Sequence, residues 1–188
     1  MAGMILLTSV ASAQGQDQRQ YQLAENAYSI RIEGTSNVHD WDMQAEDLQG
    51  KAVVSWDQNT LKGFEKVHIT VPAKKIESGK RIMNNKTYDA LEAENNPFIR
   101  FELVSVSNMS TSGSEFSGTA TGTLKIAGQS NIVSIPFEGK RADENSFTVT
   151  GNFSLQMTEF GIDPPKAMLG TLKTGDKITL NYTLTFNH

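Results

Sequence analysis

The stretch SFTVTGNFSLQM, residues 146–157, indicates the fold class because its side chains alternate without interruption. Every odd position from Phe147 to Met157 is apolar or glycine, and every even position is polar. Successive side chains of a β-strand point to opposite faces, so this pattern predicts a strand with one face in water and one face in a core. The segment has about twelve residues, whereas a typical strand has 5–6.

The same alternation recurs along the chain, with apolar or small residues at the even positions of 116–126 and 178–186. Further strands are predicted at residues 28–33, 37–45, 51–56, 66–71, 98–106 and 132–139. Short connections rich in turn residues favour antiparallel hairpins. These are nine segments, and eight or nine strands are expected because two early segments could be halves of one bent strand.

One-sided antiparallel strands must bury their apolar faces in a sandwich or in a closed barrel. The strand lengths favour a single barrel, and so do Gly118, Gly122, Gly139 and Gly151 on the apolar faces. Glycine inside a strand marks a bend or a close approach to the backbone. These glycines therefore either leave room for a ligand or only relieve curvature, and both readings stay open. Pro136 lies in mid-strand and cannot donate a ladder bond, so it is expected at a bulge or an unpaired edge.

One short helix is predicted in the first half of residues 79–103, with Ser78 as a plausible N-cap. A single helix between two barrel strands is expected across one end of the barrel, where it plugs that end or frames an entrance. Its basic flank would then be exposed to solvent near the rim. The apolar face of the helix is formed by Met83, Thr87, Ala90 and Leu91.

Charge is uneven along the chain. Residues 62–86 carry seven basic and two acidic side chains, whereas the whole protein has a net charge of −4. One interpretation is a transient contact between this region and an anionic headgroup or a membrane surface, and the other is a solvated face of a soluble protein. The acidic balance argues against sequence-independent nucleic-acid binding, which depends on neutralising phosphates.

The N-terminus has the pattern of a secretory signal peptide. Residues 1–10 form a short apolar run, Ala11-Ser12-Ala13 is a small-x-small cleavage signature, and a polar segment follows. Cleavage is expected near Ala13, which leaves one domain over residues 14–188. A positively charged start is missing, which leaves an upstream start open, and a cytosolic protein with an apolar tail is the alternative. The sequence has no cysteine, so it forms no disulfide and no thiolate metal site.

Few residues of the sequence suggest catalysis or metal binding. His39, Asp40 and Asp42 are the residues that most suggest a metal or a general base, but alternation places His39 on one strand face and the two carboxylates on the other. No metal site and no catalytic residue are predicted, and replacing all three by alanine is expected to leave ligand binding within a few fold. The connection at residues 160–170, with Ile162, Met168 and Leu169, is interpreted either as a lid or as ordinary core.

Five stretches in order resemble the YceI-like family: GTSNVHDWDMQAEDLQGKAVV (34–54), VPAKKIESG (71–79), YDALEAENNPFIRFEL (88–103), GTLKIAGQSNIVSIPFEGK (122–140) and EFGIDPPKAMLGTLKTGDKITLNYTL (159–184). No single motif is decisive, but the ordered set covers essentially the whole chain after the predicted signal peptide. The resemblance implies an extended lipocalin-like antiparallel β-barrel in the periplasm or outside the cell. It also implies a long amphiphilic isoprenoid or similar lipid inside the barrel, and it supplies no invariant catalytic set. The stretch from His39 to Asp42 resembles one branch of the family and does not identify the ligand.

We therefore expect an all-β, eight-to-nine-stranded barrel with one helix near one end, which carries or stores an amphiphilic lipid of quinone or polyprenyl type. No cofactor is expected, and the oligomeric state is open, a homodimer included. The alternative is a secreted interaction or stress protein with a solid core and no bound small molecule. A third possibility, an enzyme that acts on the lipid, is not supported by any set of candidate catalytic residues. Gly122→Leu is expected to weaken binding while the fold survives if the barrel is hollow. The expected apolar lining is Ile30, Ile32, Val67, Ile69, Met83, Leu91, Phe101, Phe116, Ala120, Gly122, Leu124, Val133, Ile135, Phe137, Val149, Phe153, Leu155, Leu180, Tyr182 and Leu184.

Overall fold

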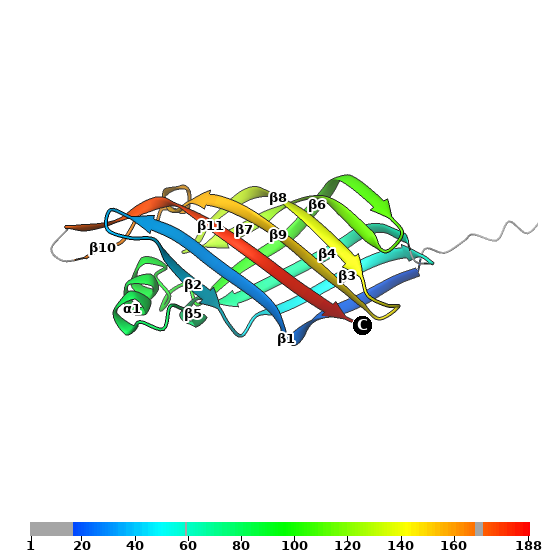
Figure 1. Cartoon of the computed structure of the whole chain (residues 1–188), viewed down its shortest axis with the longest axis horizontal. Helices are drawn as coiled ribbons and strands as arrows, with labels where there is room; N and C mark the ends of the chain where they lie inside the picture. Colours follow the sequence, from blue (N-terminus) through cyan, green and yellow to red (C-terminus); the bar gives the residue numbers. More distant parts are fainter. Residues whose placement is uncertain (1–16, 59, 168–170) are drawn as a thin grey trace, which may run out of the picture.

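The computed structural model describes residues 17–58, 60–167 and 171–188, so the predicted signal peptide and the candidate lid residues Met168 and Leu169 lie outside the described residues. Figure 1 shows an elongated barrel of long strands with the short helix α1 at one end. No helix in the described ranges is long and apolar enough to cross a membrane. In chain order the elements are β1 (Asp17–Ser36), β2 (Trp41–Ala45), β3 (Gln49–Asp57), β4 (Thr60–Pro72), the 3₁₀ helix η1 (Ala73–Lys75), β5 (Ile76–Glu77), α1 (Arg81–Ala90), β6 (Phe98–Ser112), β7 (Glu115–Ile126), β8 (Gln129–Arg141), β9 (Ser146–Gln156), the 3₁₀ helix η2 (Met157–Phe160), β10 (Lys166–Ala167) and β11 (Leu172–Asn187).

Eight long antiparallel strands close the barrel. Their order is β11-β9-β8-β7-β6-β4-β3-β1, and pairing between β1 and β11 joins the two edges. Strand β10 pairs with β11, while β2 and β5 extend the wall from β1 at the helix end. The single antiparallel barrel predicted from the strands is therefore confirmed, and so is the lipocalin-like barrel that the family resemblance implies.

Strand β1 is longer than predicted, and it changes partners along its length. Its first residues pair with β3, and its last residues pair with β2. The register against β11 shifts between Leu23 and Tyr28, where Asn26 has a positive φ of 58°. The bend in the early chain therefore lies inside β1. The predicted segment 37–45 is a separate strand that begins only at Trp41, because the Ser36 hydroxyl accepts hydrogen bonds from the backbone N–H groups of Val38 and His39 and holds a turn there.

An aromatic cluster fills the end of the barrel opposite α1, and we call it the aromatic plug. Phe147 is fully buried at its centre, stacks on Phe186 and meets Tyr21 edge-on. The guanidinium of Arg141 lies 4.4 Å from the centre of the Trp56 ring and donates to backbone carbonyl groups of Gln58 and Asp143. Because rings and a hydrogen-bonded cation occupy this end, it forms a packed core. The plug consists of Tyr21, Trp56, Phe64, Phe116, Phe137, Phe147 and Phe186.

The glycines on the inner wall make room for aromatic rings on neighbouring strands. Gly139 pairs with Phe116, and a Cβ added to the glycine would lie 2.2 Å from that ring. Gly118 and Phe137 form a second such pair, with a separation of 2.9 Å. A ring laid over a glycine shields its backbone and lets the wall bend. These glycines therefore do not leave room for a ligand, because the space beside each one is already filled by a side chain, and the reading that they relieve curvature agrees with the structure.

Candidate functional site

A wide cavity of about 870 Å³ opens at the helix end of the barrel. Its walls come from β1, β2, β11 and the first residues of β6, and α1 forms part of its rim. The apolar face of α1 contributes Met83, Ala90 and Leu91 to the lining, as the helical periodicity predicts. The helix therefore frames an entrance at one end of the barrel.

The start of α1 differs from the prediction. Ser78 is not its N-cap, because the helix begins at Arg81 and its N-cap Lys80 makes no side-chain capping bond. The buried side chain of Asn84 instead accepts hydrogen bonds from the backbone N–H and the hydroxyl of Ser78, both at 2.8 Å. This explains why an asparagine interrupts the apolar face of the helix, since it ties α1 to the chain that precedes it.

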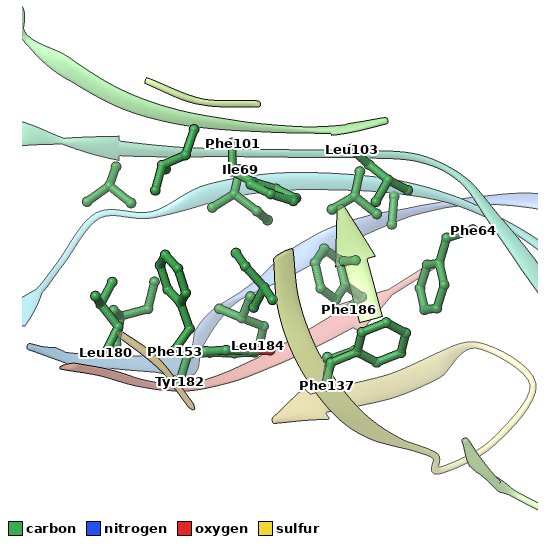
Figure 2. Close-up of a pocket in the computed structure, with 18 of the residues that line it drawn as sticks. Phe64, Ile69, Phe101, Leu103, Phe137, Phe153, Leu180, Tyr182, Leu184 and Phe186 are labelled. Carbon is green, nitrogen blue, oxygen red and sulfur yellow. The ribbon is translucent and has the colours of Figure 1, made fainter. Parts of the chain in front are cut away.

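A second, narrower cavity of about 180 Å³ continues toward the aromatic plug. Its lining consists of alanine, valine, isoleucine, leucine and phenylalanine side chains, with Tyr182 the exception among the described residues. Figure 2 shows these side chains pointing from opposite walls into the space between them. Phe64, Phe137 and Phe186 line this cavity and belong to the plug, so they form its floor. The two cavities share the side chains Ile30, Val71, Ile99, Leu124 and Leu180 and therefore meet at one ring of residues.

The hydroxyl of Tyr182 is satisfied within the wall and does not point into the cavity as a free polar group. It donates a hydrogen bond of 2.9 Å to the carbonyl oxygen of Pro136, and burial raises the pKa of Tyr182 to about 12. A Cβ on Gly151 would lie 2.4 Å from this hydroxyl, so the glycine lets the tyrosine cross β9 to reach β8. Strand β8 pairs with β9 only from Glu138 onward within the described residues, so Pro136 lies at an unpaired edge, as predicted.

Most of the side chains predicted to line the interior border one of the two cavities, and their role in binding a ligand stays a prediction. Those at the wide cavity are Ile30, Ile32, Met83, Leu91, Leu124, Leu155 and Leu180. Those at the narrow cavity are Ile30, Val67, Ile69, Phe101, Ala120, Leu124, Ile135, Phe137, Val149, Phe153, Leu180, Tyr182 and Leu184.

Three predicted lining residues border neither cavity. Phe116 lies deeper, in the aromatic plug. Val133 packs against the buried core from the part of β8 that is not paired with β9. Gly122 is covered by the ring of Phe101, and an added Cβ would lie 2.5 Å from that ring and from the carbonyl oxygen of Glu102. The expectation that Gly122→Leu would keep the fold is therefore wrong, because the backbone carbonyl cannot move aside cheaply.

Strand alternation missed lining residues where the register shifts. A bulge on β6 between Leu103 and Ser105 turns Val104 outward, with 65% of its surface exposed, and brings Val106 to the cavity. A similar shift on β4 brings Phe64 inward, outside the predicted strand 66–71. Such bulges leave no clear signal in the sequence. Other unpredicted apolar lining residues are Trp41, Met43, Ala45, Ala52, Val71, Ile76, Ile82, Ile99, Leu103, Ile126, Met157, Ile162, Leu172, Ile178 and Phe186.

The basic region 62–86 does not form one surface. Lys62 lies near the plug end, where it pairs with Asp57 at 3.1 Å, and Lys75 pairs with Asp47 at 2.7 Å. The contact with Asp47 raises the pKa of Lys75. Lys80, Arg81 and Lys86 line the mouth of the wide cavity, and the described residues offer them no ion pair. The folded chain therefore brings only Lys80, Arg81 and Lys86 of this basic region together at the mouth.

The His39 stretch and the connection after β9 also differ in part from expectation. His39 lines the wide cavity, although none of His39, Asp40 and Asp42 was expected to contact the ligand tail. Asp42 instead lies 3.5 Å from Arg31 on the outer surface. No three His, Cys, Asp or Glu side chains in the described ranges gather as metal ligands.

Ile162 is buried and lines the wide cavity, so this part of residues 160–170 packs as core.

Comparisons with known proteins agree with this architecture. A family model described as YceI-like domain matches residues 21–186. No curated protein sequence matches the chain significantly. BcnA of Burkholderia cenocepacia has a TM-score of 0.67 and 15% identity over 87% of this chain and 98% of its own. A Saccharophagus degradans domain, described as polyisoprenoid binding and implicated in plant cell wall breakdown, has a TM-score of 0.70 and 10% identity over 89% of this chain and 97% of its own. A Campylobacter jejuni YceI protein has a TM-score of 0.58 and 18% identity over 100% of this chain and 99% of its own. At these identities the structures show a shared fold.

Proposed function

Because this chain belongs to the YceI-like domain family, we propose that it binds one amphiphilic lipid, with the apolar tail in the barrel and the headgroup at the helix end. The observation that carries the proposal is the apolar space itself, which runs from the mouth beside α1 through the narrow cavity to the aromatic plug. A tail that fills this space gains roughly 25 cal/mol per Å² of apolar surface removed from water, before ordering costs.

The tail is proposed to be an isoprenoid of quinone or polyprenyl type. Two points support this choice: the resemblance of the chain to its family, and the polyisoprenoid-binding description of the Saccharophagus degradans domain. The wide and the narrow cavity together form a long space. Strand β11 has twelve residue steps between Thr174 at the mouth and Phe186 at the floor, which is about 40 Å along the strand at roughly 3.3 Å per residue. A long, slender tail suits such a space.

The chain is proposed to carry or store this lipid without transforming it, outside the cytoplasm. The proposed location rests on the signal-peptide pattern of residues 1–13, and N-terminal sequencing of the secreted or periplasmic protein would test it. A homodimer and a membrane contact stay predictions. Two exposed apolar side chains lie near the mouth: Ile82 on α1, with 74% of its surface exposed, and Val38, which precedes His39. Substitutions at these two positions would test a dimer or membrane contact.

Solvent extraction of the purified protein, followed by mass spectrometry, tests the proposal directly. An isoprenoid lipid near one molecule per chain is the expected result. Protein that yields no lipid, and that takes up neither added quinone, nor prenol, nor fatty acid, would support the alternative of an interaction or stress protein that acts through its outer surface. Metal near one equivalent per chain, lost when His39, Asp40 and Asp42 are replaced by alanine, would contradict binding without catalysis.

A further inference from the structure

The charged side chains at the mouth of the wide cavity share one sign, and the other polar residues there are His39, Ser36, Thr87 and Thr174. Lys80, Arg81 and Lys86 on and before α1, and Lys166 on β10, all line this cavity. No aspartate or glutamate lines it in the part of the chain that the structure describes. The protein as a whole has a net charge of −4, so this local excess of cations opposes the overall balance.

The geometry of α1 adds to this positive character. The first turn of the helix carries no acidic residue, and its N-cap makes no side-chain bond. The first backbone N–H groups of a helix bear a partial positive charge, and the first-turn residues Arg81, Ile82 and Met83 all line the cavity. The helix and the side chains therefore present charge of the same sign to one place.

Lys86 holds a defined position across the mouth. Its ammonium group donates a 2.9 Å hydrogen bond to the backbone carbonyl of Lys166, so it bridges α1 and β10, which Figure 1 shows at the same end of the barrel. An ammonium group has three donors, and the described residues accept one of them in a hydrogen bond. The remaining donors are available to a ligand at the top of the apolar space.

From the shared sign of these charges we infer that the mouth binds a phosphate headgroup, with the tail of the same molecule in the cavity below. Lysine and arginine bind phosphate through charge-assisted hydrogen bonds, which are stronger than bonds between neutral groups. This inference rests on the proposed function and adds the chemical class of the headgroup. It favours a polyprenyl phosphate over a quinone, whose neutral head can accept hydrogen bonds from the four cations but cannot neutralise their charge.

The test compares two probes with the same tail, geranylgeranyl monophosphate and geranylgeraniol, through quenching of tryptophan fluorescence. Trp41 lines the wide cavity and reports on its occupancy. The full chain is expected to bind the phosphate about tenfold more tightly or better, because hydrogen bonds to charged groups are worth more than neutral ones. The variant K80Q/R81Q/K86Q should lose this preference and still bind the alcohol. Glutamine is a good helix former, and K86Q alone serves if the triple variant does not fold.

A matched control changes the same charge elsewhere. The variant K51Q/K62Q/K66Q removes three cations from β3 and β4, none of which lines either cavity, and should keep the preference for the phosphate. Equal affinity of the wild type for both probes, or a preference that survives in K80Q/R81Q/K86Q, would overturn the inference and leave the proposed function standing. Failure to bind either probe would overturn the proposed function itself. Inorganic phosphate that displaces the lipid phosphate at equal concentration would show a site for free anions and would overturn the lipid headgroup.

Discussion

At the scale of single residues, Ala120 is the position where the narrow cavity can be filled without straining the wall. Its side chain already points into the cavity from β7, whereas Gly122 on the same strand has no room for a Cβ. We expect Ala120→Phe to lower lipid retention at least about tenfold, because the ring takes the space of the tail, and to change the free energy of unfolding by less than about 1 kcal/mol. Lipid content after purification and urea unfolding are the two measurements.

The neighbouring position Thr123 lines neither cavity and supplies the control for Ala120. Thr123→Phe should leave lipid content unchanged. If the interior were close-packed, Ala120→Phe would instead overpack it and cost about 1–3 kcal/mol. Lost stability with unchanged lipid content would therefore contradict a hollow barrel.

Because of Tyr182, the free energy of unfolding should depend on pH in the alkaline range. Burial raises its pKa in the folded state to about 12, above the value near 10 expected in the unfolded chain. The folded state therefore holds the proton more tightly, and this contribution is complete below about pH 10 and is lost as the pH rises toward 12. The wild type should lose at most about 2–3 kcal/mol more than Tyr182→Phe over this interval, measured by urea unfolding. Identical pH profiles would mean that the hydroxyl titrates normally.

At the scale of elements, α1 depends on one buried asparagine. Asn84→Ala leaves the N–H and the hydroxyl of Ser78 without their acceptor, and we expect a loss of about 1–3 kcal/mol in unfolding free energy. A looser α1 should also speed lipid exchange, because the helix frames the mouth. Stopped-flow displacement of a fluorescent lipid measures this rate. The adjacent, exposed Asn85 is the control: Asn85→Ala should cause no loss, because alanine is the better helix former, and an equal loss would show that the hydrogen bonds to Ser78 are not responsible.

The strand bounds show how much of the fold the alternation of side chains predicts by itself. Residues 146–157 alternate cleanly and form β9, whose bounds differ from the prediction by one residue at the C-terminal end. The first half of β1 is polar and was missed, because its pairing with β3 decides its conformation more than its own side chains do. Register shifts near Val104 and Asn26 come from long-range pairing, so they could not be predicted from the local sequence.

The candidate site was predictable to a different degree at its two ends. The narrow cavity follows from strand parity, and most of its lining was expected. The mouth brings together residues far apart in sequence, such as His39, Lys86 and Lys166, and no periodicity links them. The ion pairs that remove Lys62 and Lys75 from the basic region likewise appear only in the folded chain.

At the scale of the whole molecule, stability and binding are expected to depend on opposite ends. Phe147 is fully buried in the aromatic plug and lines neither cavity. Phe147→Ala should cost about 3–5 kcal/mol in unfolding free energy, because it deletes a large ring from a packed core. Lipid affinity of the folded fraction should change little, the reverse of Ala120→Phe. Calorimetry and lipid titration below the midpoint of unfolding separate the two effects, and a parallel loss of both would contradict this division.

The aromatic plug also determines the order of events in any exchange. A tube that is sealed at one end fills and empties through the same opening. The tail must enter first and leave last, so a departing lipid always presents its headgroup to the receiver. If the chain carries a lipid as proposed, its donor and its receiver would use the same end of the protein and could not occupy it together. Under the proposed function, loading and delivery would therefore take place one after the other at the helix end of the barrel.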